Sequence, residues 1–104
     1  MSEIIVVKSE TTVVNKRFEP YDVYIGRPSQ WGNPFSHQDN TLAKFKVSTR
    51  EEAVSAYRAW VMDPLQAELR VLARKQLKGK RLGCWCKPLA CHGDVLKEIA
   101  DGID

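Results

Sequence analysis

The segment KRLGCWCKPLACHGDVLKEIA, Lys80–Ala100, contains all three cysteines of the chain and one of its two histidines. Its first part, Lys80–Cys86, is short and bounded by glycine and proline, which is typical of a strand. Its last part, His92–Ala100, has apolar residues at helical spacing and predicts a closing helix. The inward residues of that helix would be Val95, Leu96 and Ile99. The segment therefore predicts a strand, a loop and a helix.

Side chains alternate along a strand, so Leu82, Cys84 and Cys86 would share one face and Trp85 the other. Cys91 would then follow the turn, where the last helix begins. In α/β sheets, ligand crevices form beyond the carboxyl ends of the strands. We therefore expect a functional site at this strand end.

Three interpretations of the cluster remain open. The first is metal binding, because three thiols and an imidazole are the ligand set of a closed structural zinc site. The candidate ligands would be Cys84, Cys86, Cys91 and His92. The spacing does not favour zinc, because one pair has a single residue between its members and the other pair has none.

The second interpretation is a reactive thiol at Cys91. A thiol at a helix N-terminus lies beside unpaired amides and the positive end of the dipole, which favour the thiolate. His92 would act as acid and base, and Asp94 would orient it. The third interpretation is packing around Trp85, since cysteine behaves as a small hydrophobe. Packing is favoured for single cysteines but explains the whole cluster poorly.

Upstream of this segment, the sequence predicts two helices. The segment TREEAVSAYRAWV, Thr49–Val61, begins with a capping box of Thr49 and Glu52. Its apolar stripe consists of Ala53, Val54, Tyr57, Trp60 and Val61. A second helix would restart at Asp63 and Pro64 and stop at Gly79. Its buried face would contain Leu65, Leu69, Leu72 and Ala73.

The N-terminal half of the chain predicts strands and a long loop. Strands are expected at Glu3–Val7, Thr11–Asn15 and Asp22–Gly26, the first two forming a hairpin. Residues Arg27–Val47 have little periodicity and predict an ordered, functional loop. A helical connection before the last strand favours a parallel crossover. We therefore expect one small α/β domain over residues 1–104, with a mixed β-sheet flanked by about three helices.

The loop GRPSQWGNPF, Gly26–Phe35, has residue types that suit a small planar or phosphorylated ligand. Arg27 would clamp an anion, Trp31 would stack and Asn33 would read an edge. Alternatively, Trp31 and Phe35 plug the core and Arg27 is solvated. Taken alone, this loop favours the alternative.

Composition limits the class of protein and of partner. Sixteen basic and thirteen acidic residues give a net charge of +3, without a basic block, which tolerates an anionic ligand but does not indicate nucleic-acid binding. No apolar run is long enough for a membrane span or an export signal. An odd number of clustered cysteines favours a cytoplasmic protein with reduced or metal-bound thiols. The sequence does not define the oligomeric state.

The segments VYIGRPSQWGNPF and GKRLGCWCKPLACHGDVL, with the capped helix between them, resemble the family called domain of unknown function 4326. This family comprises small bacterial and bacteriophage proteins, and the resemblance covers about Val13 to Ala100. It implies no established activity. Its first motif would contain Asn15, Arg27, Trp31, Gly32, Asn33 and Pro34. Its second motif would contain Cys84, Trp85, Cys86, Pro88, Cys91, His92, Gly93 and Asp94.

Together these features predict a nucleotide-like or phosphorylated ligand, bound between the Arg27–Phe35 loop and the Cys84–Asp94 loop. The ligand-binding residues would be Asn15, Arg27, Trp31 and Asn33. If a reaction occurs, Cys91 would be nucleophile or polar anchor, and His92 and Asp94 would assist it. The alternative is a non-enzymatic, zinc-binding phage or bacterial accessory module that binds a host protein or DNA.

Overall fold

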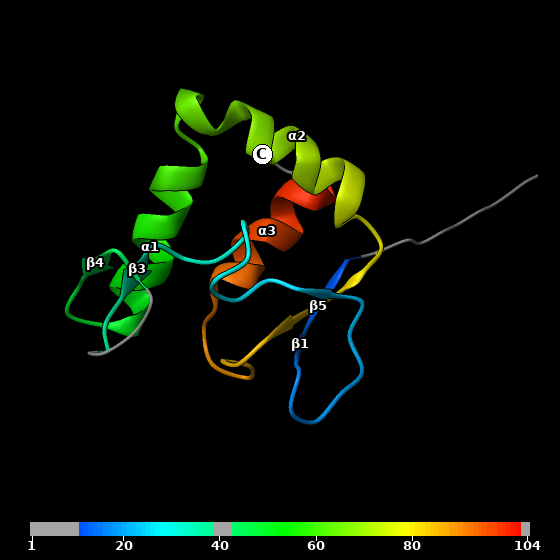
Figure 1. Ribbon diagram of the computed structural model, residues 1–104, viewed down its shortest axis with the longest axis horizontal. Coiled ribbons are helices and arrows are strands. Elements are labelled where there is room, and N and C mark those ends of the chain that lie inside the picture. Colours follow the sequence, from blue (N-terminus) through cyan, green and yellow to red (C-terminus); the bar gives the residue numbers. More distant parts are fainter. Residues whose placement is uncertain (1–10, 39–42, 103–104) are drawn as a thin grey trace, which may run out of the picture.

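Three helices cover one face of a three-stranded sheet in the computed structural model, which describes residues 11–38 and 43–102 (Figure 1). This arrangement confirms the α/β class. The sheet contains β1 (Thr12–Asn15), β5 (Arg81–Cys84) and β2 (Val23–Tyr24) in that order. Each is a shorter form of a predicted strand. The expected strand Glu3–Val7 lies outside the described residues.

Strand β5 lies between β1 and β2 and runs parallel to both. Leu82 is the register partner of Val13 on one side and of Val23 on the other. The predicted parallel crossover is therefore confirmed. All strand pairs within the described ranges are parallel, so the antiparallel pair of the expected mixed sheet is not among them. The predicted hairpin with Glu3–Val7 lies outside the described residues.

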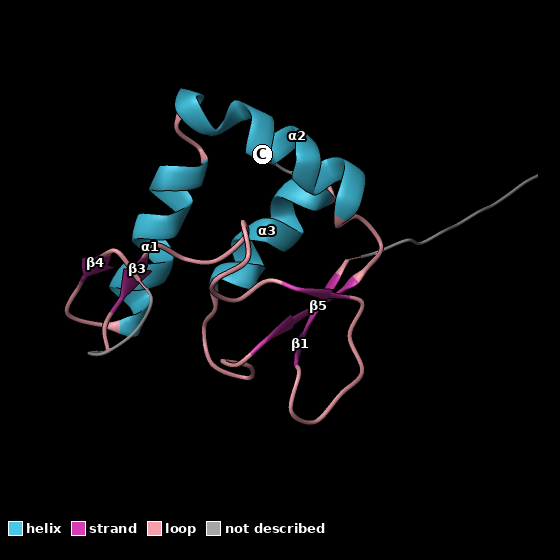
Figure 2. Cartoon of the chain, in the orientation of Figure 1, coloured by secondary structure: helices cyan, strands magenta, loops and turns pink. Residues whose placement is uncertain are grey.

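A second, smaller sheet lies inside the predicted loop Arg27–Val47. Strand β3 (Phe35–Ser36) pairs in parallel with β4 (Phe45–Lys46), and the rings of Phe35 and Phe45 stack with centroids 5.2 Å apart. Two-residue strands give too short a pattern for sequence periodicity to detect. This sheet packs at one end of the first long helix (Figure 2).

Helix α1 (Arg50–Val61) begins where its capping residues predict. Thr49 Oγ1 accepts from the Glu52 backbone N–H at 3.1 Å, and the Glu52 carboxylate accepts from the Ser48 N–H at 2.8 Å. The Glu52 side chain thus reaches one residue further back than in a standard capping box. The predicted stripe is confirmed, with Ala53, Tyr57 and Val61 buried and Val54 and Trp60 packed against the core.

The predicted second helix begins as a 3-10 turn, η1 (Pro64–Gln66), and continues as α2 (Ala67–Gln76). Asp63 caps the turn by accepting from the Leu65 N–H at 2.9 Å. The prediction that Leu65 is buried is wrong, since its side chain is 89% exposed. A 3-10 turn has about three residues per turn, so Leu65 leaves the apolar stripe of α2. Gly79 has a φ of 76°, as a left-handed stop requires.

Helix α3 (His92–Ala100) lies between the sheet and the other two helices (Figure 1). Its inward residues Val95, Leu96 and Ile99 are fully buried, as predicted. Gly93 allows the first turn to approach the sheet closely, because a Cβ there would lie 2.7 Å from Ile25 Cδ1 and 2.8 Å from Val13 Cγ1. No helix within residues 11–38 and 43–102 has the length and apolar character needed to cross a membrane.

Asn15, the last residue of β1, ties the sheet to the cysteine loop. Its side-chain amide donates to the carbonyl oxygens of Trp85 at 3.3 Å and Lys87 at 2.8 Å. Its side-chain oxygen accepts from the Arg17 N–H at 2.9 Å. Because Asn15 is only 9% exposed, these three bonds replace water for a nearly buried amide.

Substituting Gly93→Ala should destabilise the fold by about 1–3 kcal/mol, because the new methyl group has no room between Val13 and Ile25. Helix propensity alone would favour alanine, so the two effects have opposite signs. Urea unfolding of the two single variants and of Val13→Ala/Gly93→Ala measures the interaction. The double variant should lose less free energy of unfolding than the two single variants together. A neutral or stabilising effect of Gly93→Ala would contradict the close packing of Gly93.

Substituting Asn15→Asp should lower the free energy of unfolding by at least about 2 kcal/mol near neutral pH. The change keeps the shape but turns a carboxylate toward two carbonyl oxygens and removes both donors. Gln30→Glu makes the same chemical change at an exposed loop position and is the control. Equal urea midpoints for the two variants would show that Asn15 does not hold the loop.

Candidate functional site

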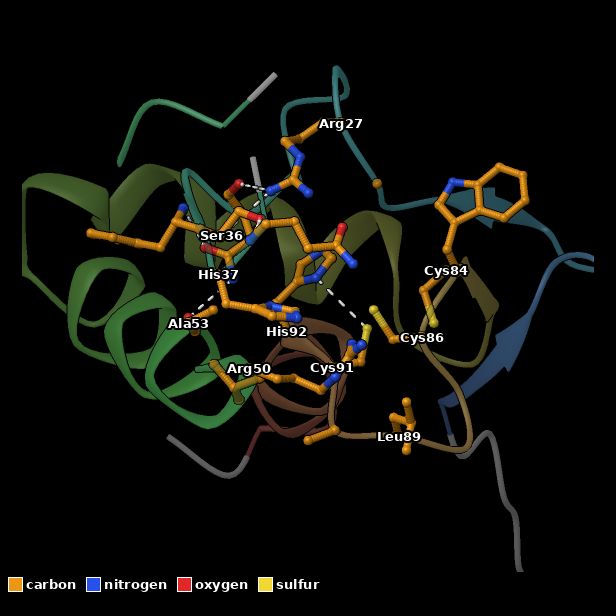
Figure 3. Close-up of a pocket in the computed structure, with 17 residues that line it drawn as sticks. Arg27, Ser36, His37, Arg50, Ala53, Cys84, Cys86, Leu89, Cys91 and His92 are labelled. Atoms are coloured by element: carbon orange, nitrogen blue, oxygen red, sulfur yellow. Dashed lines mark hydrogen bonds between the residues drawn. The ribbon is translucent and has the colours of Figure 1, made fainter. Parts of the chain in front are cut away.

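A cavity of about 320 Å³ opens between the two loops that the sequence singled out (Figure 3). It lies beyond the carboxyl ends of β2 and β5, as expected for a parallel sheet. Helix α1 and residues 36–38 form the opposite wall. The polar residues that line it include Arg27, Asn33, His37, Arg50 and His92, and within residues 11–38 and 43–102 no Asp or Glu lines it.

Two predicted ligand-binding residues line this cavity. Arg27 is held in place because its Nη1 donates to the carbonyl oxygens of Asn33 at 2.8 Å and Phe35 at 3.5 Å. Asn33 in turn donates to the Ala53 carbonyl at 3.0 Å and accepts from the Phe35 N–H at 2.9 Å. Asn33 therefore fixes the loop on α1, and Arg27 is the residue of the pair with donors left for a ligand.

The other two predicted ligand-binding residues lie elsewhere. Trp31 is 3% exposed and belongs to the core, and its carbonyl accepts from the Tyr57 hydroxyl at 3.0 Å. The alternative in which Trp31 plugs the core is thus the one seen. Asn15 is hydrogen-bonded to the backbone of the cysteine loop and is not among the residues that line the cavity. Trp85 lines the cavity instead; it is 51% exposed and donates from Nε1 to the Tyr24 hydroxyl at 3.0 Å.

Arg50 is a cavity residue that the sequence analysis missed. It occupies the first turn of α1, and Figure 3 shows its side chain among those around the cavity. A cation is unfavourable near a helix N-terminus, because it meets the positive end of the dipole. An arginine directly after the capping residue Thr49 was therefore a signal that another interaction holds it there.

Cys91 and His92 adjoin at the floor of the cavity. His92 Nε2 lies 2.7 Å from the Ile25 carbonyl oxygen, so Nε2 carries the proton and donates it. Burial lowers the pKa of His92 and keeps the ring neutral. Nδ1 is then an acceptor, 3.7 Å from Cys91 Sγ, so the predicted cysteine–histidine pair is in contact (Figure 3).

The three thiols differ in exposure and in acidity. Cys84 and Cys91 are 1% exposed, whereas Cys86 is partly exposed and lines the cavity. Interaction with the other two sulfur atoms raises the pKa of Cys91, with burial adding to the effect. Interaction with the Cys91 thiol, assisted by Arg50 and then Arg27, lowers the pKa of Cys86 to about 6.

Cys84 also has its pKa lowered to about 6, first by the Cys91 thiol and then by backbone N–H groups of Lys87 and Cys86. However, Cys91 has one proton and can donate it to one sulfur at a time. Cys86 lies near Arg50 and Arg27 and is partly exposed to solvent, so the thiolate is favoured at Cys86. Burial and a raised pKa oppose the predicted role of Cys91 as nucleophile and suit its alternative role of polar anchor.

Asp94 organises the loop and not the imidazole. One carboxylate oxygen accepts from the Cys91 backbone N–H at 3.3 Å, and the other lies 2.6 Å from Lys87 Nζ. Both nitrogens of His92 are already occupied by the Ile25 carbonyl and Cys91. The structure therefore separates Asp94 from the predicted task of orienting His92.

The geometry gives no support to the predicted zinc site. Although the three thiols lie close together, no group of three or more His, Cys, Asp or Glu side chains within the described ranges is placed to hold a metal ion. Of the four candidate ligands, Cys84, Cys86, Cys91 and His92, the histidine directs Nε2 to a carbonyl.

Comparison with known proteins gives the chain a family. Residues 8–102 match the family model described as Domain of unknown function (DUF4326). The chain is also 33% identical over 92 residues to an uncharacterized 12.4 kDa protein in the nrdA-td intergenic region of Enterobacteria phage T4. That alignment covers 88% of this chain and 78% of the phage protein. No solved structure matches the chain significantly. The protein therefore belongs to the DUF4326 family.

Proposed function

We propose that this domain binds a small phosphorylated ligand, of nucleotide type, in the cavity between the two loops. The observation that carries the proposal is the charge of the lining: Arg27 and Arg50 are on the wall, and no carboxylate is among the described residues that line it. A pair of guanidinium groups in a recess attracts an anion and concentrates it there.

The arginines are suited to phosphate in particular. A guanidinium presents five N–H donors in a planar fork that matches two phosphate oxygens. Arg27 uses only Nη1 to bind the loop carbonyls, so within the described residues Nε and Nη2 are the donors that can serve a ligand. Because the loop already fixes this side chain, binding costs less rotamer entropy.

The cavity also offers apolar surface for a planar group. Trp85, Phe35 and Leu89 are among its lining residues, and Trp85 has half of its surface exposed. An aromatic face of this kind stacks on a base without reading its sequence. A volume of about 320 Å³ is at the small end of ligand pockets, which range over about 300–1,000 Å³. This size favours a mononucleotide over a dinucleotide.

The first test is thermal unfolding with a panel of nucleoside mono-, di- and triphosphates, the free nucleosides and pyrophosphate. A ligand at about 100 times its Kd stabilises the folded state by about 2.7 kcal/mol, so a member of the panel should raise Tm by several degrees. Arg50→Gln should weaken binding by roughly tenfold or more, because a charge-assisted bond contributes about 1.5–3 kcal/mol.

Lys75→Gln is the matched control, since it removes one positive charge from the exposed surface of α2, away from the cavity lining. It should bind like the unaltered protein. The proposal fails if no phosphorylated compound raises Tm, or if Arg50→Gln and Lys75→Gln lose the same affinity.

Trp85→Leu separates base recognition from phosphate recognition. Loss of the indole should weaken the binding of nucleotides by roughly 1–3 kcal/mol and leave the binding of pyrophosphate unchanged. Isothermal titration calorimetry with both compounds measures the difference. If nucleotide and pyrophosphate affinities fall together, Trp85 supports the loop and does not stack on the ligand.

A further inference from the structure

The thiol cluster has features that ligand binding does not use. Of the three sulfur atoms, only that of Cys86 belongs to a partly exposed residue, and it lines the cavity. The Cys91 thiol lies close enough to Cys86 and Cys84 to lower the pKa of both. Figure 3 shows the labelled cysteines directing their sulfur atoms into one small region. An accessible thiol is thus paired with a buried one.

The surroundings of Cys86 stabilise its thiolate and polarise an incoming molecule. The positive charges of Arg50 and Arg27 lie near enough to Cys86 to lower the pKa of its thiol. Among the described residues, no carboxylate lines the cavity to offset these two charges. A guanidinium with several donors can stabilise a thiolate and, with another N–H, an oxygen that gains negative charge as it leaves.

The neighbouring thiol, Cys91, is also placed to react in a second step. Interaction with the other two sulfur atoms, and then burial, raises the pKa of Cys91 and keeps it protonated, although its sulfur accepts from the Gly93 N–H at 3.4 Å, which acts in the opposite direction. His92 Nδ1, a neutral acceptor, lies 3.7 Å from Cys91 Sγ and can accept the proton when this sulfur reacts. Redox-active cysteines combine these three properties: an acidic thiol, access to solvent, and a second thiol beside it.

We propose that Cys86 is a site of oxidation by hydrogen peroxide and that Cys91 then closes a disulfide with it. In the first step the Cys86 thiolate attacks one peroxide oxygen, an S–O bond forms and the O–O bond breaks. The second oxygen leaves as hydroxide and takes up a proton to give water. Peroxide is reduced by two electrons, and Cys86 becomes a sulfenic acid.

In the second step Cys91 sulfur attacks Cys86 sulfur. The S–S bond forms, the S–O bond breaks, and the departing hydroxide combines with the Cys91 proton as a second water molecule. His92 Nδ1 can hold that proton during the transfer. Two thiols and one peroxide therefore give one disulfide and two waters, with no further oxidant or reductant. This chemistry is independent of the proposed phosphorylated ligand.

The experiment treats the reduced full-length protein with about one equivalent of hydrogen peroxide and follows intact mass, with peptide mapping of the product. The unaltered chain should lose two hydrogen masses and carry a Cys86–Cys91 link. Cys91→Ser should stop at the sulfenic acid, seen as the gain of one oxygen mass and as a dimedone adduct. Cys86→Ser should form neither product. Cys84→Ala keeps both reacting thiols and is the matched control, so it should form the disulfide.

Arg50→Gln tests the electrostatic part of the proposal, with Lys75→Gln as the charge control. Oxidation of Cys86 should slow several-fold in the first variant and stay unchanged in the second. Far-UV circular dichroism verifies that every variant is folded; serine keeps an N-capping side chain at position 91. The proposal is overturned if Cys86→Ser is oxidised as fast as the unaltered chain, if the mapped disulfide excludes Cys86, or if Arg50→Gln reacts at the unaltered rate.

Discussion

Strand β5 bonds to a parallel neighbour along each edge, and this placement determines where the functional residues meet. Parallel strands end at the same edge of a sheet, so the residues that follow β1, β2 and β5 come together there. Asn15, Arg27 and Cys84 are at or just beyond those three ends. Helix α3 then returns from the same edge and closes one side of the cavity. The site is a consequence of sheet order.

Many polar side chains in the two loops hold the loop backbone in place through hydrogen bonds, and few of them line the cavity. The side chains of Asn15, Asn33 and Asp94 each bond to backbone groups of a neighbouring segment. Arg27 does the same with one nitrogen and still presents a cation to the cavity. Loops without regular structure must satisfy their backbone groups by such bonds, which explains why so much of both motifs is polar.

The acidity of the three cysteines is set within the cluster. Neighbouring sulfur atoms and burial keep Cys91 protonated, so negative charge falls on a neighbouring sulfur, and the arginines favour Cys86. The two guanidinium groups that would attract a phosphate also lower the pKa of that thiol. A positively charged recess would therefore be the common physical basis of the ligand binding and the thiol chemistry that we propose.

Features that depend on a few neighbouring residues could be predicted from the sequence: the Thr49 cap, the apolar stripes, the strand–loop–helix segment and a cavity between the two motifs. The complete fold was needed to show that Trp85 and not Trp31 lines the cavity, that Arg50 joins it, and that Leu65 is exposed. Caps and periodicity act within one or two helical turns, whereas burial and acidity depend on groups brought together from distant segments. The sequence therefore identifies candidate residues for the site, and the fold decides which of them line the cavity.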